Sequence, residues 1–253
     1  MSAAPALPFE GFFAEMGRFF ITLGRVFAWT PRRPWDLREL LRQMVRIGVN
    51  SAPVVLLTAL FTGAVMALQT YTVLVRFSAE GFVASIVALS MVRELACVIG
   101  GLVIAGRSGS AMAAEIGTMR VTEQIDALEA LATDPIHYLM VPRVWATTLT
   151  VPLLILLADA VGIVGGYLVA VILMGSNPVS YWSKTFQYMD FDDLFSGVAK
   201  AAVFGMLLAT IGCMKGFYTR GGAEGVGKAT TQAVVMASIA ILITDFFLTK
   251  LFF

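Results

Sequence analysis

Residues 91–131 read MVRELACVIGGLVIAGRSGSAMAAEIGTMRVTEQIDALEAL, an apolar segment that contains Arg93 and Glu94 and then becomes charged and amphipathic. A charged side chain in the middle of a membrane-spanning helix costs about 2.5–3.5 kcal/mol on insertion scales, so it is normally kept for a partner or a pathway. The stretch therefore predicts a helix that carries a buried charged pair and then leaves the membrane. This combination indicates a protein that is driven from outside the bilayer.

The composition of the whole chain is that of an integral membrane protein. Of its 253 residues, 58% are hydrophobic and only 14% are charged, and the mean hydropathy is +0.82. Soluble domains are less apolar and carry more charge. The formal net charge is +1, and the basic residues lie at the ends of apolar segments rather than in a binding stripe. Neither feature indicates a nucleic-acid partner.

The residues that most often bind metals are scarce. Cys97 and Cys213 both lie in apolar segments, where a cysteine acts as a small core residue. His137 is the single histidine of the chain. We therefore predict neither a disulfide nor a metal site.

Five apolar segments are long enough to span a bilayer, since about 20 helical residues cross a hydrocarbon core of about 30 Å. The predicted fold is an all-α integral membrane protein with spans at residues 51–75, 81–113, 144–174, 194–214 and 229–253. These spans make one membrane domain at residues 51–253, preceded by an N-terminal region at residues 1–50. Pro142 and Pro152 are the expected bending points near the third span. The GxxxG pattern from Gly162 to Gly166 predicts close packing of that span against another helix.

The N-terminal region contains an amphipathic helix rather than a sixth span. The large apolar residues of 9–27 fill one helical face, and charged residues such as Glu10, Glu15 and Arg18 fill the other. Such a helix lies in the membrane interface, and its two glutamates argue against a secretory signal. Residues 31–46 then predict a turn and a short cytoplasmic helix that leads into the first span.

The distribution of lysine and arginine near the span ends predicts the orientation. One side holds Arg18, Arg25, Arg32, Arg33, Arg38, Arg42, Arg46, Arg107, Arg120, Arg143, Lys215, Arg220 and Lys228. The other side holds only Arg76, Lys184 and Lys250, with Lys200 close to it. We therefore expect the N-terminus to be cytoplasmic and the C-terminus to lie outside.

Arg93 and Glu94 do not neutralise each other, because neighbours on a helix point about 100° apart. Each needs another partner, and the candidates are the remaining charges of the spans: Asp159, Asp193, Lys200 and Asp245. One interpretation is a salt-bridge network that only holds the bundle together. The other is a polar patch in an apolar cavity, which would suit an amphiphile with a charged head. The depth of Arg93 and Glu94 favours the second.

Residues 115–132 predict an amphipathic helix between the second and third spans. Its apolar residues recur at helical spacing at Val121, Ile125, Leu128 and Leu131, and an acidic row of Glu123, Asp126 and Glu129 lies on another side. Pro135 ends the helix. A solvated linker is one interpretation, but a helix that exposes both rows is better suited to docking in a groove on a partner protein.

Two patterns resemble catalytic motifs without their chemistry. Residues 222–229 approach a phosphate-binding GxxxxGK[ST] loop, yet Ala229 replaces the magnesium-binding hydroxyl and no buried strand precedes it. Residues 106–110 are not a nucleophile elbow, and no usable histidine completes a hydrolase triad. We therefore expect no ATP binding by this chain alone and no hydrolase activity.

Motifs across residues 63–147 closely resemble the MlaE family of ABC transporter permeases, also called YrbE or, in chloroplasts, the TGD permeases. The motifs are Leu68-Gln69, Ser78-Ala79-Glu80, Arg93-Glu94-Leu95, Ala105-Gly106-Arg107, Ser110 to Gly117, Met119-Arg120, Thr122-Glu123-Gln124, Asp134-Pro135 and Pro142-Arg143. The resemblance continues more weakly through Gly162–Gly166, Lys200, Phe204 and residues 229–231.

The resemblance implies a homodimeric permease of the bacterial inner membrane that transfers phospholipids between the inner and outer membranes. Its partners would be two cytoplasmic ABC ATPase subunits that bind ATP and magnesium, a periplasmic ring of six MCE-domain subunits and, often, a STAS-domain subunit. This chain would hold no cofactor and would not itself be an enzyme.

The resemblance also assigns roles to residues. Residues 115–132 would be the coupling helix on the ATPase, with Glu115, Arg120, Glu123, Asp126 and Glu129. Polar groups of the lipid cavity would come from Arg93, Glu94, Asp193 and Lys200, and its apolar wall from Tyr71, Leu74 and Phe77. Phe77 stands where some relatives carry tyrosine.

Two other classes of function remain as alternatives. A proton-coupled secondary transporter would use Glu94, Asp159 and Asp245 as a relay, but five spans without an inverted repeat or paired broken helices argue against it. A passive membrane anchor would leave the charges within the spans unexplained.

Overall fold

The chain is helical in nearly all of the part that the structure describes. The computed structural model describes residues 8–30 and 37–252, with side chains from residue 13 onward. The elements in chain order are α1 (Pro8–Trp29), α2 (Leu37–Leu74), η1 (Val75–Phe77), η2 (Glu80–Phe82), α3 (Val83–Ser90), η3 (Met91–Leu95), α4 (Ala96–Ile104), η4 (Ala105–Gly109), α5 (Ser110–Val121), α6 (Gln124–Ala130), η5 (Ile136–Met140), α7 (Val141–Tyr167), η6 (Leu168–Leu173), α8 (Pro178–Gln187), α9 (Phe191–Phe217) and α10 (Gly222–Phe252). η1 and η2 are 3-10 helices, whereas η3 to η6 are π-helical.

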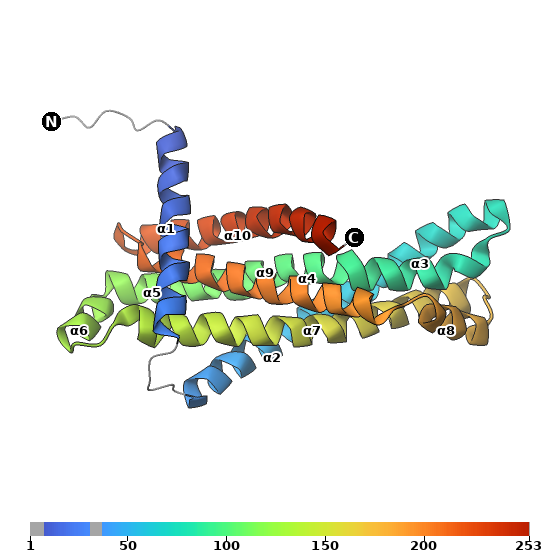
Figure 1. Cartoon of the computed structure of the whole chain (residues 1–253), viewed down its shortest axis with the longest axis horizontal. Coiled ribbons are helices and arrows are strands. Elements are labelled where there is room, and N and C mark those ends of the chain that lie inside the picture. The colour runs from blue at the N-terminus through green and yellow to red at the C-terminus, as the bar shows by residue number, and fades with distance from the viewer. Residues whose placement is uncertain (1–7, 31–36, 253) are drawn as a thin grey trace.

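Five helical runs in the described residues are long and apolar enough to cross a membrane. They are Leu37–Phe77, Glu80–Val121, Ile136–Leu173, Phe191–Phe217 and Gly222–Phe252. The runs lie roughly side by side along the long axis of the molecule (Figure 1). The prediction of an all-α integral membrane protein with five spans is therefore confirmed. The first, second and fourth runs extend beyond both predicted ends of their spans, whereas the third begins earlier than predicted but ends at Leu173, and the fifth is described from Gly222 to Phe252.

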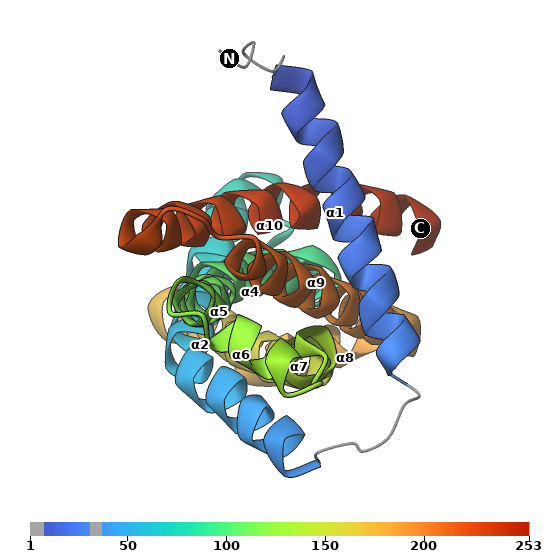
Figure 2. The ribbon, with the colours of Figure 1, turned by 90° about the vertical axis from the view of Figure 1, so that its left-hand side faces the viewer.

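Helix α1 lies outside the bundle and crosses its long axis near one end (Figures 1 and 2). Its inner face buries Thr22 and Val26, whereas Phe13 and Phe20 are exposed. An ion pair between Glu15 and Lys215 connects α1 to α9. Helix α1 therefore packs on the bundle through one face and leaves large apolar side chains exposed on another. Residues 31–36, where a turn was predicted, lie outside the described residues.

Residues 37–50 do not form a short helix of their own. They are the first part of α2, which continues to Leu74 with Pro53 inside it. Proline removes one backbone hydrogen bond but can remain in a spanning helix where neighbouring helices support the backbone. The boundary predicted at residue 50 therefore falls inside one continuous helix.

The prediction of one helix over residues 115–132 is wrong. Helix α5 carries the second span on to Val121, and Glu123 then adopts a left-handed φ of 59° before α6 begins at Gln124. The hydroxyl of Thr122 donates to the carbonyl of Thr118 at 2.9 Å, a local bond that competes with the regular helix. The apolar periodicity therefore continues across a break that it does not reveal.

The third span ends within one residue of its predicted end, but the helix that follows it was not predicted. The span ends at Leu173, Gly175 has a positive φ of 75°, and a separate helix α8 follows. The side chain of Asn177 caps α8 by accepting from the backbone N–H groups of Val179 at 2.9 Å and Ser180 at 3.2 Å. Burial raises the pKa of Tyr181 in α8, so its hydroxyl stays protonated and donates to the carbonyl of Ile163 at 3.2 Å.

Glycines bring α2 and α7 into backbone contact. A Cβ atom on Gly63 would lie 1.9 Å from the carbonyl oxygen of Gly162, and one on Gly165 would lie 2.1 Å from that of Leu60. No side chain fits at such distances, so small residues here allow the two helices to approach closely. The close packing predicted from the GxxxG pattern is therefore confirmed.

Candidate functional site

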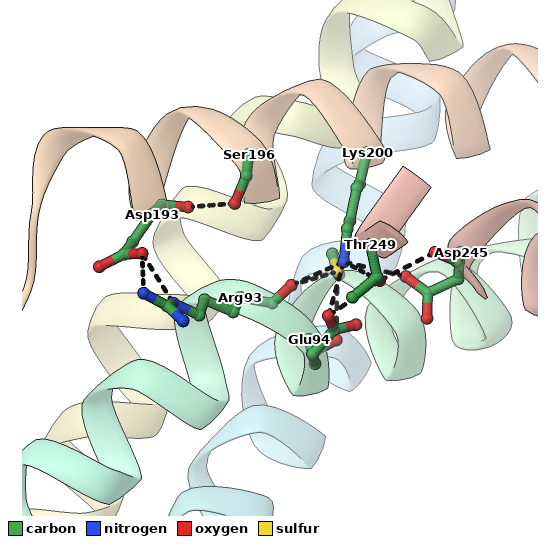
Figure 3. Close-up of polar contacts among 8 residues, drawn as sticks. Arg93, Glu94, Asp193, Ser196, Lys200, Asp245 and Thr249 are labelled. Atoms are coloured by element: carbon green, nitrogen blue, oxygen red, sulfur yellow. Dashed lines mark hydrogen bonds and ion pairs between the residues drawn. The ribbon is translucent and has the colours of Figure 1, made fainter. Parts of the chain in front are cut away.

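Charged residues from the second, fourth and fifth spans meet inside the bundle. We call the group formed by Arg93, Glu94, Asp193, Lys200 and Asp245 the charge cluster (Figure 3). Arg93 and Glu94 come from η3, Asp193 and Lys200 from α9, and Asp245 from α10. The charges come from three different spans, so the cluster joins the second, fourth and fifth spans.

Arg93 pairs with Asp193 at one side of the cluster. The Nε and Nη2 atoms of Arg93 lie 2.7 and 2.6 Å from the Oδ1 atom of Asp193. The other carboxylate oxygen accepts from the backbone N–H of Asp190 at 3.1 Å, in a capping box at the start of α9. The side chain of Asp193 is 3% exposed, whereas that of Arg93 is 38% exposed. The pair therefore has a buried acidic half and an accessible basic half.

Lys200 lies at the centre of the other side, with its side chain 0% exposed. Its ammonium donates to the carboxylate of Glu94 at 2.8 Å, the hydroxyl of Thr249 at 2.7 Å and the carbonyl of Arg93 at 3.1 Å. The Oδ1 atom of Asp245 lies 3.3 Å away as a further ion pair. A buried lysine is normally retained only with such partners. All three N–H donors of the ammonium have acceptors, so Lys200 holds the surrounding groups together in addition to supplying a positive charge.

The adjacent residues Arg93 and Glu94 thus have different partners, which confirms the prediction from helix geometry. A close approach between α9 and η3 makes this arrangement possible. A Cβ atom on Gly197 would lie 2.4 Å from the carbonyl oxygen of Val92. Asp193 and Lys200 lie four residues before and three residues after Gly197, on the same helical face. The glycine therefore brings both charged side chains against the Arg93–Glu94 turn.

The cluster differs from the sequence-based expectation at two residues. Asp159 is buried in α7 and forms no ion pair with any residue in the described part of the chain. Of the two carboxylates predicted to form a network, only Asp245 joins the charge cluster. Thr249 was not predicted, although its place one helical turn after Asp245 could have indicated it. Its hydroxyl donates to Glu94 at 2.9 Å and accepts from Lys200.

The residues predicted to form an apolar cavity wall lie elsewhere in the single chain. The hydroxyl of Tyr71 donates to the carbonyl of Met174 at 3.2 Å, and Tyr71 lines a pocket of about 280 Å³ with Gly81 and Tyr181. Arg93 does not line this pocket. Leu74 is half-buried and Phe77 is exposed at the end of η1. One chain alone therefore does not join the predicted wall to the charge cluster.

The five residues predicted to couple to a partner divide into two groups. The carboxylate of Glu115 pairs with Arg46 at 2.9 Å and with Arg143 at 3.0 Å, within the end of the bundle. The other four lie at or beyond the end of the second span: Arg120 and Asp126 form a 2.6 Å ion pair between α5 and α6, and Glu123 and Glu129 are exposed. Glu115 therefore connects α2, α5 and α7, whereas α6 presents the acidic row.

The five apolar spans and the charge cluster define a multi-pass helical membrane protein with a polar site inside its bundle. The family model described as permease MlaE matches residues 40–251. The chain therefore belongs to the MlaE permease family.

Individual relatives agree with the family assignment. A probable ABC transporter permease protein of Rickettsia prowazekii is 51% identical over 220 residues, which cover 87% of this chain and 85% of that protein. The intermembrane phospholipid transport system permease protein MlaE of Haemophilus influenzae is 40% identical over 243 residues, or 96% and 93% of the two chains. The chloroplastic protein TRIGALACTOSYLDIACYLGLYCEROL 1 of Arabidopsis thaliana is 40% identical over 216 residues, or 85% of this chain and 62% of that one.

Proposed function

We propose that this chain is the permease subunit of an ABC transporter that moves phospholipids between the inner and outer membranes of a bacterium. The observation that carries the proposal is the charge cluster, which places an accessible guanidinium and a buried ammonium among apolar spans. The name of the Haemophilus influenzae relative, which refers to intermembrane phospholipid transport, supports the choice of substrate.

In this proposal two copies enclose an outward-facing cavity that holds the lipid tails, with the head group near Arg93. Helix α10 supports the idea of a second copy, because it exposes large apolar side chains along its length, including Ile239, Ile243 and Phe247. Two ATPase subunits would bind ATP and magnesium on the cytoplasmic side. A ring of six MCE-domain subunits would lie outside, and a STAS-domain subunit is a further partner. The N-terminus would be cytoplasmic and the C-terminus periplasmic.

Purification of the tagged chain from native membranes in mild detergent tests the proposed assembly. Mass spectrometry of the sample should identify an ABC ATPase, an MCE-domain protein and enriched phospholipid. A chain that purifies without an ATPase would contradict the proposal and favour a secondary transporter. A proton relay through Glu94, Asp159 and Asp245 has no support in the geometry, since Asp159 forms no hydrogen bond or ion pair with either carboxylate in the described part of the chain.

Replacing Arg93 with alanine is expected to reduce phospholipid transfer at least about tenfold, because the accessible hydrogen-bond donor for the lipid phosphate is lost. Transfer would be measured between liposomes with the purified complex, and assembly by co-purification of the partner subunits. Arg93→Ala also leaves Asp193 buried without its cation.

The double variant Arg93→Ala with Asp193→Asn removes that unpaired charge. It should assemble as the unchanged chain does and still fail in transfer. If the double variant transfers lipid normally, Arg93 has only a structural role.

We further propose that α6 binds the ATPase through its acidic row. The variant with Glu123→Lys and Glu129→Lys should lower ATPase co-purification about tenfold. Two exposed carboxylates that would attract a basic surface of the ATPase are replaced by ammonium groups that would repel it. Asp126 is left unchanged, since it pairs with Arg120. Glu80→Lys, at the opposite end of the second span, is the control and should have no effect. Retention of a stimulated ATPase in the double variant would contradict this docking site.

A further inference from the structure

A second group of arginines lies at the other end of the second span, far from the charge cluster. It lines a pocket of about 220 Å³ between α2 and the junction of η4 with α5. Gln43, Arg46 and Asn50 line it from α2, and Arg107, Ser108 and Glu115 from the second span. We call it the arginine pocket. Arg93 and Arg107 are 14 residues apart (107 minus 93), or about 21 Å along a helix, so this pocket is separate from the charge cluster.

The arginine pocket carries an excess of positive charge. Its carboxylate, Glu115, is held on one oxygen by Arg46 at 2.9 Å and on the other by Arg143 at 3.0 Å. Arg107 is exposed and forms no ion pair with any residue in the described ranges. The guanidinium of arginine matches the geometry of a phosphate group and binds it through two parallel hydrogen bonds. The pocket therefore presents two arginines to an anion, with its one carboxylate already neutralised.

The pocket lies where the charge-free part of the bundle begins. The hydroxyls of Ser51 and Ser108 form a 3.1 Å hydrogen bond between α2 and η4, next to the pocket residues Asn50 and Arg107. Residues 51–75 contain no charge, so the apolar part of α2 starts directly beside the pocket. A lipid phosphate lies at this depth, between the hydrocarbon core and water.

An exposed apolar stripe leads away from the pocket along α2. Asn50 is followed on the same helical face by Val54, Leu57 and Phe61, all of them exposed. The stripe continues from the polar pocket into the charge-free part of the span. A polar pocket at the end of an apolar stripe is complementary to a phospholipid, in which a polar head group is joined to an apolar acyl chain.

Arg107 lies on a π-helical segment, as does Arg93. A π-helical turn widens the helix and frequently occurs at functional sites. Open space adjoins the turn, since a Cβ atom on Gly106 would meet no atom within 4 Å. The local backbone is therefore distorted where the arginine faces the pocket, and the surrounding space is free for a ligand.

From these observations we propose that the arginine pocket binds the phosphate of a membrane phospholipid, whose acyl chain lies along Val54, Leu57 and Phe61. The site belongs to the membrane leaflet at the arginine-rich end of the bundle, where basic pockets between spanning helices recognise anionic head groups. The inference does not depend on the proposed function, because the arginine pocket lies at a different end of the helical bundle from the charge cluster.

Photolabelling with a phosphatidylglycerol that carries a diazirine in its head group tests the site. The full chain, with the subunits that co-purify, would be labelled in nanodiscs of phosphatidylcholine, and the labelled peptides identified by mass spectrometry. Label is expected on peptides that contain residues 43–50 and 107–115. Arg107→Gln should reduce this label about tenfold, the size expected for losing a hydrogen bond to a charged group.

Two further variants distinguish lipid binding in the arginine pocket from non-specific electrostatic attraction between anionic lipid and surface arginines. Ala111→Phe fills the pocket, which Ala111 lines, without changing its charge, and should reduce the label as strongly. Arg42→Gln removes an exposed arginine one turn from Arg46 that does not line the pocket, and should leave the label unchanged. An equal effect of Arg42→Gln and Arg107→Gln, or no effect of Arg107→Gln, would overturn the proposal.

A competition experiment distinguishes a lipid head group from a soluble phosphate ester. Glycerol phosphate added in large excess should leave most of the label in place, because it lacks the acyl chain that binds α2. If it removes the label as effectively as unlabelled phosphatidylglycerol does, the pocket binds a soluble phosphate ester and the lipid assignment is wrong.

Discussion

Replacing Lys200 with methionine is expected to lower the free energy of unfolding by about 3–5 kcal/mol, the usual cost of removing one partner of a buried ion pair. The side chain of Lys200 is fully buried, and its ammonium lies 2.8 Å from Glu94 and 3.3 Å from Asp245. Without it, two carboxylates would face each other with no cation between them. The apparent midpoint of thermal unfolding of the purified chain in mild detergent measures the effect.

Two matched variants test that explanation of the loss. Lys228→Met removes a lysine whose side chain is 71% exposed and whose ion pair with Glu224 is at the surface, so it should change stability by less than about 1 kcal/mol. Lys200→Met combined with Glu94→Gln and Asp245→Asn should recover most of the loss, because no unpaired charge remains. If Lys200→Met unfolds no earlier than Lys228→Met, the buried cation does not hold the cluster together.

Replacing Gly197 with alanine is expected to separate α9 from η3 and to disrupt both sides of the charge cluster. The added Cβ atom would lie 2.4 Å from the carbonyl oxygen of Val92. This contact is with the backbone, so no side-chain rotation relieves it. We expect a loss of stability of about 1–3 kcal/mol, typical of overpacking, together with at least about tenfold slower lipid transfer. Thermal unfolding and liposome transfer measure the two effects.

Gly227→Ala is the matched control for Gly197→Ala. A Cβ atom on Gly227 in α10 would meet no atom within 4 Å, and alanine is favoured over glycine inside a helix by about 1 kcal/mol. The control should therefore be neutral or slightly stabilising. Normal transfer by Gly197→Ala would show that the close approach of α9 to η3 is not needed for transport.

Local patterns in the sequence predict the elements of this fold well. The five spans follow from uninterrupted apolar length, and α1 follows from apolar and charged faces repeated at helical spacing. The angle between adjacent helix positions also predicts that Arg93 and Glu94 have different partners, because that angle is a property of one helix.

The same patterns miss features that depend on backbone detail. Apolar periodicity runs through the break at Thr122 and Glu123, although the chain there ends α5 and starts α6. The π-helical turns of η3 and η4 and the separate helix α8 are likewise invisible to hydropathy. Each involves a few hydrogen bonds whose energies are small beside the burial of a whole apolar span.

The sequence by itself therefore determined that the chain is a five-span membrane protein of the MlaE permease family with charges inside its bundle. Only the tertiary structure decided how those charges pair: Asp193 with Arg93, Lys200 with Glu94 and Asp245, and Asp159 with none of them. Hydropathy and motif spacing are local properties, and they place each charge at a depth on its own helix. Ion pairing depends instead on which helical faces meet, and here the close packing of α9 on η3 at Gly197 sets that contact.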